Sequence, residues 1–201
     1  MFAKAPVPGE VKTRLVPPLT NDQAAELYRR LVNHTLATAT NAKLCPVELW
    51  CTPTSHHVFF EHCHTRYGVT LHSQQGDDLG IRMLHAFADA LQRSKFTILI
   101  GTDCPELTHK DLASALGYLQ QGFDAVLNPA LDGGYVLIGL RQTAAELFTG
   151  IDWGTGAVLE ETRTRLRRLG WKWLELKEKR DLDRPEDLER IGLDAICDVM
   201  E

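Results

Sequence analysis

The chain has 201 residues, 44% of them hydrophobic, which is enough apolar material for one sizeable core, so we expect a single domain over residues 1–201. The formal net charge of −5 excludes the strongly basic character of a typical nucleic-acid binder. No apolar run approaches the ~20 residues of a membrane span, and we expect no signal peptide, because no charged segment followed by an apolar stretch opens the chain.

The cysteine content favours a reducing compartment. The five cysteines are odd in number and scattered, and none forms a C-x-x-C motif, so we expect free thiols and a cytoplasmic protein. Four histidines and Cys63 crowd residues 56–64 and could ligate zinc. The spacing matches no common structural zinc pattern, so a solvated helix or loop that carries several histidines is the preferred interpretation.

Strand and helix signals alternate along the chain. Thr20 and Gln23 have capping-box spacing, and the helix that they predict carries Ala24, Leu27 and Leu31 on one face, together with Tyr28. We expect strands near residues 46–52, 69–72, 96–102, 123–128, 135–140 and 171–176, with helices between most of them and a last helix opened by Pro185. This alternation predicts a three-layer α/β/α fold with a mostly parallel central sheet.

Asp103 follows the apolar run Ile98–Ile100, and Pro105 comes two residues later. The pattern predicts a buried strand that delivers a carboxylate to its C-terminal end, where ligands bind in open α/β sheets. An aspartate there can hold a divalent cation and, through it, a phosphate. The alternative is that Asp103 caps the next helix, but Thr108 is the better cap because Asp111 follows it at capping-box spacing.

Residues 4–15 form a second candidate site. Two prolines and Gly9 stiffen this segment, which contains the cations Lys4, Lys12 and Arg14. Arginine offers a planar fork to phosphate oxygens and lysine a point charge, so a loop with surface cations is suited to a diphosphate. The segment is neither a Walker loop nor a dinucleotide-binding G-x-G-x-x-G. The alternative is a basic surface turn.

Three further loops carry carboxylates or glycines. The segment just before a predicted helix contains Gly76, Asp77 and Asp78. These residues are candidates to bind a nucleobase or ribose, and the alternative is that an aspartate caps the helix. Residues 132–134, Asp-Gly-Gly, permit close approach of a ligand or form a tight hairpin-like turn. Residues 153–156, Trp-Gly-Thr-Gly, are a binding loop or a tryptophan lid over the core.

Residues 181–188 place two carboxylates before the last helix. An extended Asp-x-Asp points the side chains of Asp181 and Asp183 to one face of the chain. Asp183 is therefore a candidate ligand, and the alternative is that it caps the helix that comes after it.

The motifs, and their order along the chain, resemble those of the nucleotide-diphospho-sugar transferase superfamily, which has the GT-A-like fold. The nearest resemblance is to a bacterial family of small glycosyltransferases, and it covers nearly the whole chain. Its motifs are F-A-K-A-P-x-P-G-x-x-K-T-R-L, G-D-L-G-x-R-M, G-T-D-C-P-x-L, D-G-G-Y-x-L-I-G-L, W-x-T and D-x-D-x-x-x-D-L. The chain departs from the family at Asp77–Asp78, an acidic pair where glycine is common. A weaker resemblance, through Lys12–Leu15, extends to phospholactate guanylyltransferase-like enzymes.

The resemblance implies a role for each candidate residue. Asp103 and Asp183 look like the ligands of Mg²⁺ or Mn²⁺, so we expect them to meet at one edge of the sheet despite their separation in sequence. Asp103, Asp132 and Lys12 look like the catalytic residues. The implied substrate-binding residues are Lys4, Gly9, Lys12, Arg14, Gly76, Asp77, Asp78, Asp132, Gly133, Gly134, Trp153 and Thr155.

The motifs leave three functions open. The leading hypothesis is a metal-dependent glycosyltransferase that moves a sugar from a nucleotide-diphosphate-sugar donor to a small acceptor. The alternative is a nucleotidyltransferase that uses a nucleoside triphosphate and releases pyrophosphate. A third is a nucleotide-binding protein that keeps the fold without catalysis, because fold by itself does not imply activity.

The start of the chain gives one further expectation. Only Met1–Lys4 precede the first candidate loop, where a buried strand should already be under way, so we expect the natural protein to begin several residues upstream. A chain extended by the apolar residues encoded upstream should melt several degrees higher, because ~1 kcal/mol shifts the melting temperature of such a domain by roughly 2–4 °C. An in-frame stop codon next to Met1, or no gain in melting temperature, would contradict this.

Overall fold

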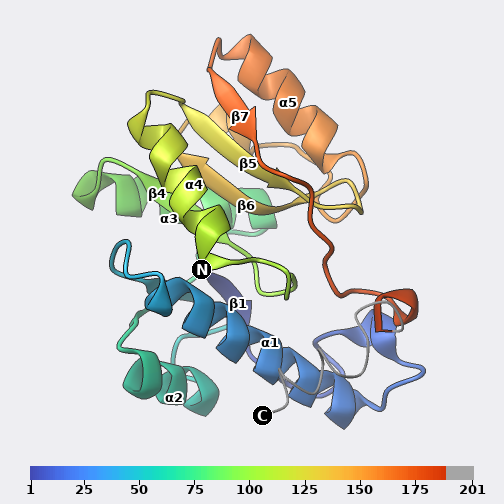
Figure 1. Cartoon of the computed structure of the whole chain (residues 1–201). Coiled ribbons are helices and arrows are strands. Elements are labelled where there is room, and N and C mark those ends of the chain that lie inside the picture. The colour runs from blue at the N-terminus through green and yellow to red at the C-terminus, as the bar shows by residue number, and fades with distance from the viewer. Residues whose placement is uncertain (189–201) are drawn as a thin grey trace. The chain divides into compact units, whose positions relative to one another are not determined.

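The computed structural model describes residues 1–188, and strands and helices alternate along it (Figure 1). The chain divides into two compact units. Unit 1 comprises Met1–Ser73, Thr102–Leu107 and the chain from Asp181 onward, and unit 2 comprises Gln74–Gly101 and Thr108–Arg180. The single domain expected over 1–201 stays a prediction.

Unit 1 contains a parallel sheet of three strands, in the order β1-β2-β3. As predicted, Thr20 begins the first helix with a capping box: its hydroxyl accepts from the Gln23 N–H, and the Gln23 side chain accepts from the Thr20 N–H. The helix face predicted from the sequence is buried. The elements of unit 1 are β1 (Phe2–Lys4), η1 (Thr13–Leu15), α1 (Asn21–Asn41), β2 (Glu48–Thr52), α2 (Val58–Tyr67) and β3 (Thr70–Ser73).

A cluster of leucines in unit 1 joins segments that are distant in the sequence. Leu15 from η1, Leu27 and Leu31 from α1, and Leu182 are all buried together. Leu182 is 1% exposed, so it anchors the segment that begins at Asp181 next to the loop between β1 and α1. The predicted last helix begins at Pro185, as expected. The residues after Leu188 lie outside the described part of the chain.

Unit 2 contains a mixed sheet of four strands, in the order β4-β6-β5-β7. Helix α4 packs against β5 and β6, and α3 packs against β4 (Figure 1). The predicted capping box of Thr108 and Asp111 begins α4. The elements of unit 2 are α3 (Leu79–Arg93), β4 (Thr97–Ile100), α4 (His109–Gln120), β5 (Ala125–Pro129), β6 (Tyr135–Leu140), η2 (Ala145–Leu147), α5 (Val158–Arg168) and β7 (Trp173–Glu175).

The predicted α/β fold with a mostly parallel sheet is confirmed, and one strand departs from the parallel direction. Strand β6 runs antiparallel to both β4 and β5. Only the short segment 130–134 joins β5 to β6, and a parallel connection needs a crossover of a dozen or more residues. The hairpin interpretation of the Asp-Gly-Gly segment therefore describes its backbone correctly.

The described residues bear on membrane spans, disulfides and metal ligands. Among the described residues, no helix is long and apolar enough to cross a membrane. Cys45, Cys51, Cys63 and Cys104 are free thiols, and Cys197 lies outside the described residues. No group of three or more acidic, histidine or cysteine side chains within residues 1–188 could hold a metal ion.

The leucine cluster predicts a large loss of stability in the variant Leu182→Ala. Truncation of a leucine that is 1% exposed should lower the free energy of unfolding by about 2–5 kcal/mol, because a cavity remains among its neighbours. Urea denaturation measures this. The control is Leu44→Ala, at a leucine that is 37% exposed, where the change should stay within about 0.5 kcal/mol. Equal losses in the two variants would contradict the anchoring role of Leu182.

Candidate functional site

The loop after β1 turns the Lys12 side chain into unit 1. Lys12 has φ 49° and ψ 34°, a left-handed conformation that residues other than glycine rarely adopt, and η1 begins at the next residue. Its side chain is only 4% exposed. The expectation that all the loop cations lie at the surface is therefore wrong for Lys12, because protein oxygens replace water around its ammonium.

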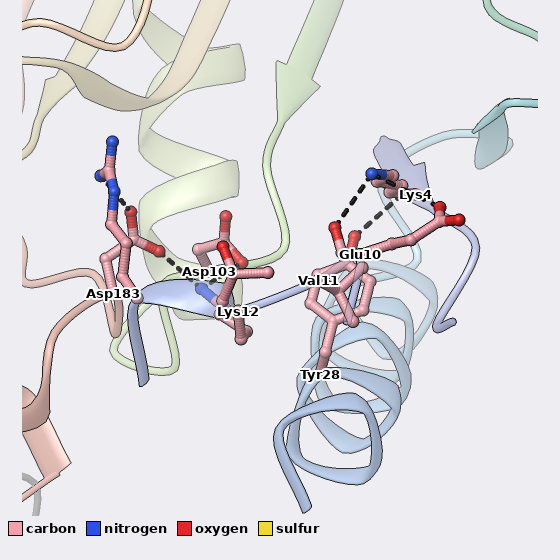
Figure 2. Close-up of a pocket in the computed structure, with 9 residues that line it drawn as sticks. Lys4, Glu10, Val11, Lys12, Tyr28, Asp103 and Asp183 are labelled. Carbon is pink, nitrogen blue, oxygen red and sulfur yellow. Dashed lines mark hydrogen bonds and ion pairs between the residues drawn. The ribbon is translucent and has the colours of Figure 1, made fainter. Parts of the chain in front are cut away.

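Three oxygens surround the Lys12 ammonium, as Figure 2 shows for the two carboxylates. Nζ donates hydrogen bonds to the Leu182 carbonyl at 2.6 Å and to Asp183 Oδ1 at 2.8 Å. It also forms an ion pair with Asp103 Oδ1 at 2.6 Å. An ammonium has three N–H donors, so each donor of Lys12 has an oxygen within reach.

These carboxylates keep Lys12 charged. Burial by itself lowers the pKa of the ammonium, but the negative charges of Asp103 and Asp183 outweigh burial and raise the pKa above its usual value. Lys12 therefore holds two carboxylates at one point, where they would otherwise repel each other.

Asp103 reaches this point because the chain directly after β4 is fixed on both sides. Thr102 is buried, and its hydroxyl donates to the Tyr28 hydroxyl at 3.2 Å. The Asp103 carbonyl accepts from the Leu182 N–H at 2.7 Å, which binds the backbones of the two acidic segments to each other. Thr108 caps α4, as preferred from the sequence, so Asp103 is not the cap.

Asp183 comes directly after the buried Leu182, and its side chain binds cations. Besides Lys12, it pairs with Arg14, whose Nη1 lies 3.4 Å from Asp183 Oδ2. The carboxylate of Asp183 is used for these cations, and Asp187, inside the last helix, bonds back to the residues before it: Asp187 Oδ2 accepts from the N–H groups of Asp183 at 3.1 Å and Arg184 at 2.8 Å.

These groups border a cavity of about 250 Å³ in unit 1 (Figure 2). Lys4 and Arg14 keep 44% and 59% of their side chains exposed, so both cations are open to a ligand. Lys4 Nζ meanwhile donates to the Glu10 carbonyl at 2.9 Å. The cavity is lined by Lys4, Glu10, Val11, Lys12, Thr13, Arg14, Tyr28, Asp103 and Asp183.

Tyr28 was expected only in the core, but its hydroxyl reaches the cavity. The hydroxyl accepts from the Lys4 N–H at 2.9 Å and from Thr102, so it joins β1 to the chain before Asp103. Burial, and then the charge of Asp103, raise the pKa of Tyr28 to about 12, so it stays protonated at neutral pH. A phenol on an otherwise apolar helix face is the signal that was available in the sequence.

The oxygens around Lys12 fit a hard divalent cation. They are two carboxylates and one backbone carbonyl, the ligand type that Mg²⁺ and Mn²⁺ prefer. Asp103 Oδ1 is enclosed and, apart from its ion pair with Lys12, has no hydrogen-bond donor among residues 1–188. The donor set thus suits the predicted metal, but a lysine ammonium lies among these oxygens.

Gly9 lies in the loop after β1 of unit 1, and the remaining predicted residues lie in unit 2, where two loops and the start of α3 meet. A Cβ atom on Gly133 would lie 2.2 Å from the Gly156 carbonyl oxygen, so the loops 132–134 and 153–156 touch through their glycines. A Cβ on Gly80 would lie 2.5 Å from Trp153 Nε1, which brings the start of α3 to the second loop. The ring of Trp153 also packs edge-on against Tyr135, with centroids 6.5 Å apart.

Several of these unit 2 residues have local structural roles. Asp78 caps α3, since its Oδ1 accepts from the Ile81 N–H at 2.8 Å. Asp132 Oδ1 accepts from the Gly134 N–H at 2.8 Å, which fixes the turn of the hairpin. Thr155 donates its hydroxyl to the Asp152 carbonyl at 2.8 Å. The capping and hairpin interpretations therefore hold for the backbone, and a ligand role for these residues stays a prediction.

Comparisons with known proteins place the chain in a family. The family described as "Uncharacterized protein conserved in bacteria (DUF2064)" matches residues 35–155, more than half of the chain. The chain belongs to this family. No curated protein matches it.

Solved structures agree with this placement. A candidate nucleotide-diphospho-sugar transferase from Desulfovibrio desulfuricans G20 shares 35% identity over 91% of this chain and 80% of that chain, with a TM-score of 0.81. The resemblance to the nucleotide-diphospho-sugar transferase superfamily, and with it the GT-A-like fold, is therefore confirmed.

More distant structures share the fold alone. A cytidylyltransferase from Leptospira borgpetersenii has 16% identity over 99% of this chain and 90% of that chain, with a TM-score of 0.56. Glucosyl-3-phosphoglycerate synthase from Mycobacterium tuberculosis has 11% identity over 86% of this chain and 76% of that chain, with a TM-score of 0.54.

The ion pairs of Lys12 predict that Lys12→Met destabilises the protein. Loss of the ammonium leaves two carboxylates without a counter-charge. Because Asp103 and Asp183 are 44% and 31% exposed, water screens part of the cost, and we expect a loss of about 1–3 kcal/mol in the free energy of unfolding. The matched control is Lys4→Met, which removes an exposed ammonium from the same loop. Adding Asp183→Asn to Lys12→Met should recover part of the loss, and equal stability of the two single variants would contradict the prediction.

The contact between the two unit 2 loops predicts a difference between two glycine substitutions. Gly133 and Gly154 have φ values of 88° and 85°, but only at Gly133 would a Cβ collide with backbone. Gly154→Ala should cost about 1 kcal/mol from its backbone conformation alone. Gly133→Ala should cost at least about 1 kcal/mol more, because the loops must separate. Thermal unfolding compares them, and equal costs would contradict the contact.

Proposed function

We propose that this protein is a glycosyltransferase that takes a sugar from a nucleotide-diphosphate-sugar donor and passes it to a small acceptor, with Mg²⁺ or Mn²⁺. The observation that carries the proposal is the gathering of Lys12, Arg14, Asp103 and Asp183 around one cavity of unit 1. Cations for a diphosphate and carboxylates for a divalent ion are the two groups that such a donor requires.

The reaction class rests on the family. Because a relative with 35% identity is a candidate nucleotide-diphospho-sugar transferase, the prediction of a transferase enzyme is confirmed at the level of the class. Use of a nucleotide is the coarser function that this family supports. The sugar, the acceptor and the metal belong to the proposal.

The cations of the loop are the proposed diphosphate contacts. Arg14 is the most open of them and can offer its planar fork to two phosphate oxygens while it stays beside Asp183. Lys4 supplies a second exposed charge next to Glu10. Gly9, with φ 81°, allows the turn between them, and a Cβ there would strain the loop.

Asp103 and Asp183 are the proposed metal ligands, with the Leu182 carbonyl as a third oxygen. When bound, the ion neutralises the charge that develops on the departing nucleoside diphosphate. The role of the chain is to hold these oxygens at one point, which the buried Leu182 and its hydrogen bond to the Asp103 carbonyl accomplish.

The loops of unit 2 carry the remaining residues that the family motifs imply. Asp132 is the proposed general base for the acceptor hydroxyl, and its bond to the Gly134 N–H holds the carboxylate in one orientation. The hydroxyl oxygen attacks the anomeric carbon, the bond from that carbon to the diphosphate breaks, and Asp132 receives the hydroxyl proton. Proposed contacts to the nucleoside and acceptor are Gly76, Asp77, Asp78, Gly133, Gly134, Trp153 and Thr155.

Nucleotidyl transfer is the second candidate. The chain matches a cytidylyltransferase over 90% or more of both proteins, so the same fold without a further domain serves that chemistry elsewhere. The same cations would then hold a triphosphate, an acceptor phosphate would attack its α-phosphorus, and pyrophosphate would leave. The free thiols support the proposal of a cytoplasmic enzyme.

The product separates the candidates. Nucleotide sugars and nucleoside triphosphates are screened by thermal shift with Mn²⁺, and those that bind are tested for turnover with sugar and phosphate acceptors. Release of a nucleoside diphosphate supports glycosyl transfer. Release of pyrophosphate from a triphosphate overturns it in favour of nucleotidyl transfer, and binding without turnover of any tested pair contradicts both.

The exposed position of Arg14 predicts a binding defect without a folding defect. Arg14→Ala should weaken nucleotide binding by about 1.5–3 kcal/mol, roughly 10- to 150-fold in Kd, which is the range for a hydrogen bond to a charged group. The free energy of unfolding should hardly change, because the side chain is 59% exposed. The control is Arg66→Ala, an exposed arginine that does not line the cavity. Calorimetry measures both, and equal affinities would remove Arg14 from the site.

A further inference from the structure

We propose that the Lys12 ammonium prevents a divalent metal ion from binding Asp103 and Asp183 until a diphosphate draws the ammonium away. The inference rests on the proposed function and adds an order of events to it. It follows from the position of one side chain, which lies among the oxygens that a metal would need.

The balance of charge at the site opposes a metal that arrives alone. Asp103 and Asp183 carry two negative charges, and Lys12 and Arg14, which pair with them, carry two positive charges. A divalent ion therefore meets a site with no net negative charge. It also meets an ammonium 2.6–2.8 Å from the oxygens that it would bind. Both effects oppose metal binding, and the low exposure of Lys12 leaves little water to screen them.

Two hydrogen bonds and an ion pair hold the Lys12 ammonium in place. It donates to the Leu182 carbonyl and to Asp183 and pairs with Asp103, so it must leave these oxygens to bind a phosphate. Lys12 can thus bind either a phosphate or the two carboxylates, but not both at once. A diphosphate supplies replacement acceptors with at least two negative charges, and the freed carboxylates then regain their affinity for a cation.

The Lys12 side chain has a place to move to. Lys12 lines the cavity, with the exposed cations Lys4 and Arg14 beside it, so a diphosphate bound by these two lies within reach of its ammonium. The left-handed backbone at Lys12 is an uncommon conformation, which a structure keeps where the surrounding contacts enforce it. The three oxygens supply those contacts.

Two Lys12 variants test the inference with Mn²⁺ as the only ligand. Lys12→Gln keeps length and polarity, and Lys12→Met removes both the charge and the polar head. Calorimetry without nucleotide should show that both bind Mn²⁺ at least about tenfold more tightly than the parent, while the control Lys110→Met, at an exposed lysine that does not line the cavity, binds like the parent. Adding Asp103→Asn to either Lys12 variant should abolish the gain. Variants that bind Mn²⁺ no better than the parent, with circular dichroism showing that they are folded, overturn the inference.

The parent protein provides a test that does not depend on any Lys12 variant. Its melting temperature is measured with Mn²⁺ alone, inorganic pyrophosphate alone, and both. We expect the shift with both to exceed the sum of the separate shifts, and Asp103→Asn to remove this excess, which controls for complexes formed in solution. A full shift with Mn²⁺ alone overturns the inference and leaves the proposed function intact. A failure of every nucleotide to bind in the thermal-shift screen overturns the proposed function instead.

Discussion

The Lys12 ammonium is the interaction on which the candidate site of unit 1 depends. Its three oxygen partners come from two segments, around Asp103 and around Asp183, that lie far apart in the sequence. Without a positive charge between them, the two carboxylates would repel each other, although their exposure of 44% and 31% lets water screen part of that repulsion. The lysine thus converts a repulsion into an attraction, and the backbone bond from Leu182 to Asp103 holds the two segments together at the same point.

Apolar packing provides the frame in which this ion cluster forms. Leu182 is buried among Leu15, Leu27 and Leu31, and the residue after it is therefore presented to the end of the loop that carries Lys12 and Arg14. The energy comes mainly from the leucines, since partly exposed ion pairs contribute little by themselves. The ion pairs orient the side chains of Lys12 and Arg14 toward the two carboxylates.

In unit 2, several of the predicted substrate-binding residues also stabilise the local fold. Asp78 caps α3, Asp132 closes a hairpin turn, and Gly133 is required where two loops touch. A residue in a recognisable motif can therefore be explained entirely by local folding, and a ligand role needs separate evidence. These contacts do rigidify the loops, and a rigid loop loses less entropy when a substrate binds.

The sequence by itself determined the elements and the type of chemistry. Thr20 and Thr108 fixed helix starts because capping is local, and the apolar face of α1 followed from its periodicity. Asp103 after a buried strand, and cations in a proline-stiffened loop, were equally visible. Tertiary structure alone decided where Lys12 points, that Asp183 turns its carboxylate to Lys12 and Arg14, and that β6 runs antiparallel. A lysine in a loop looks like a surface charge in any sequence, because burial depends on oxygens that the chain delivers from residues about 90 and 170 positions away.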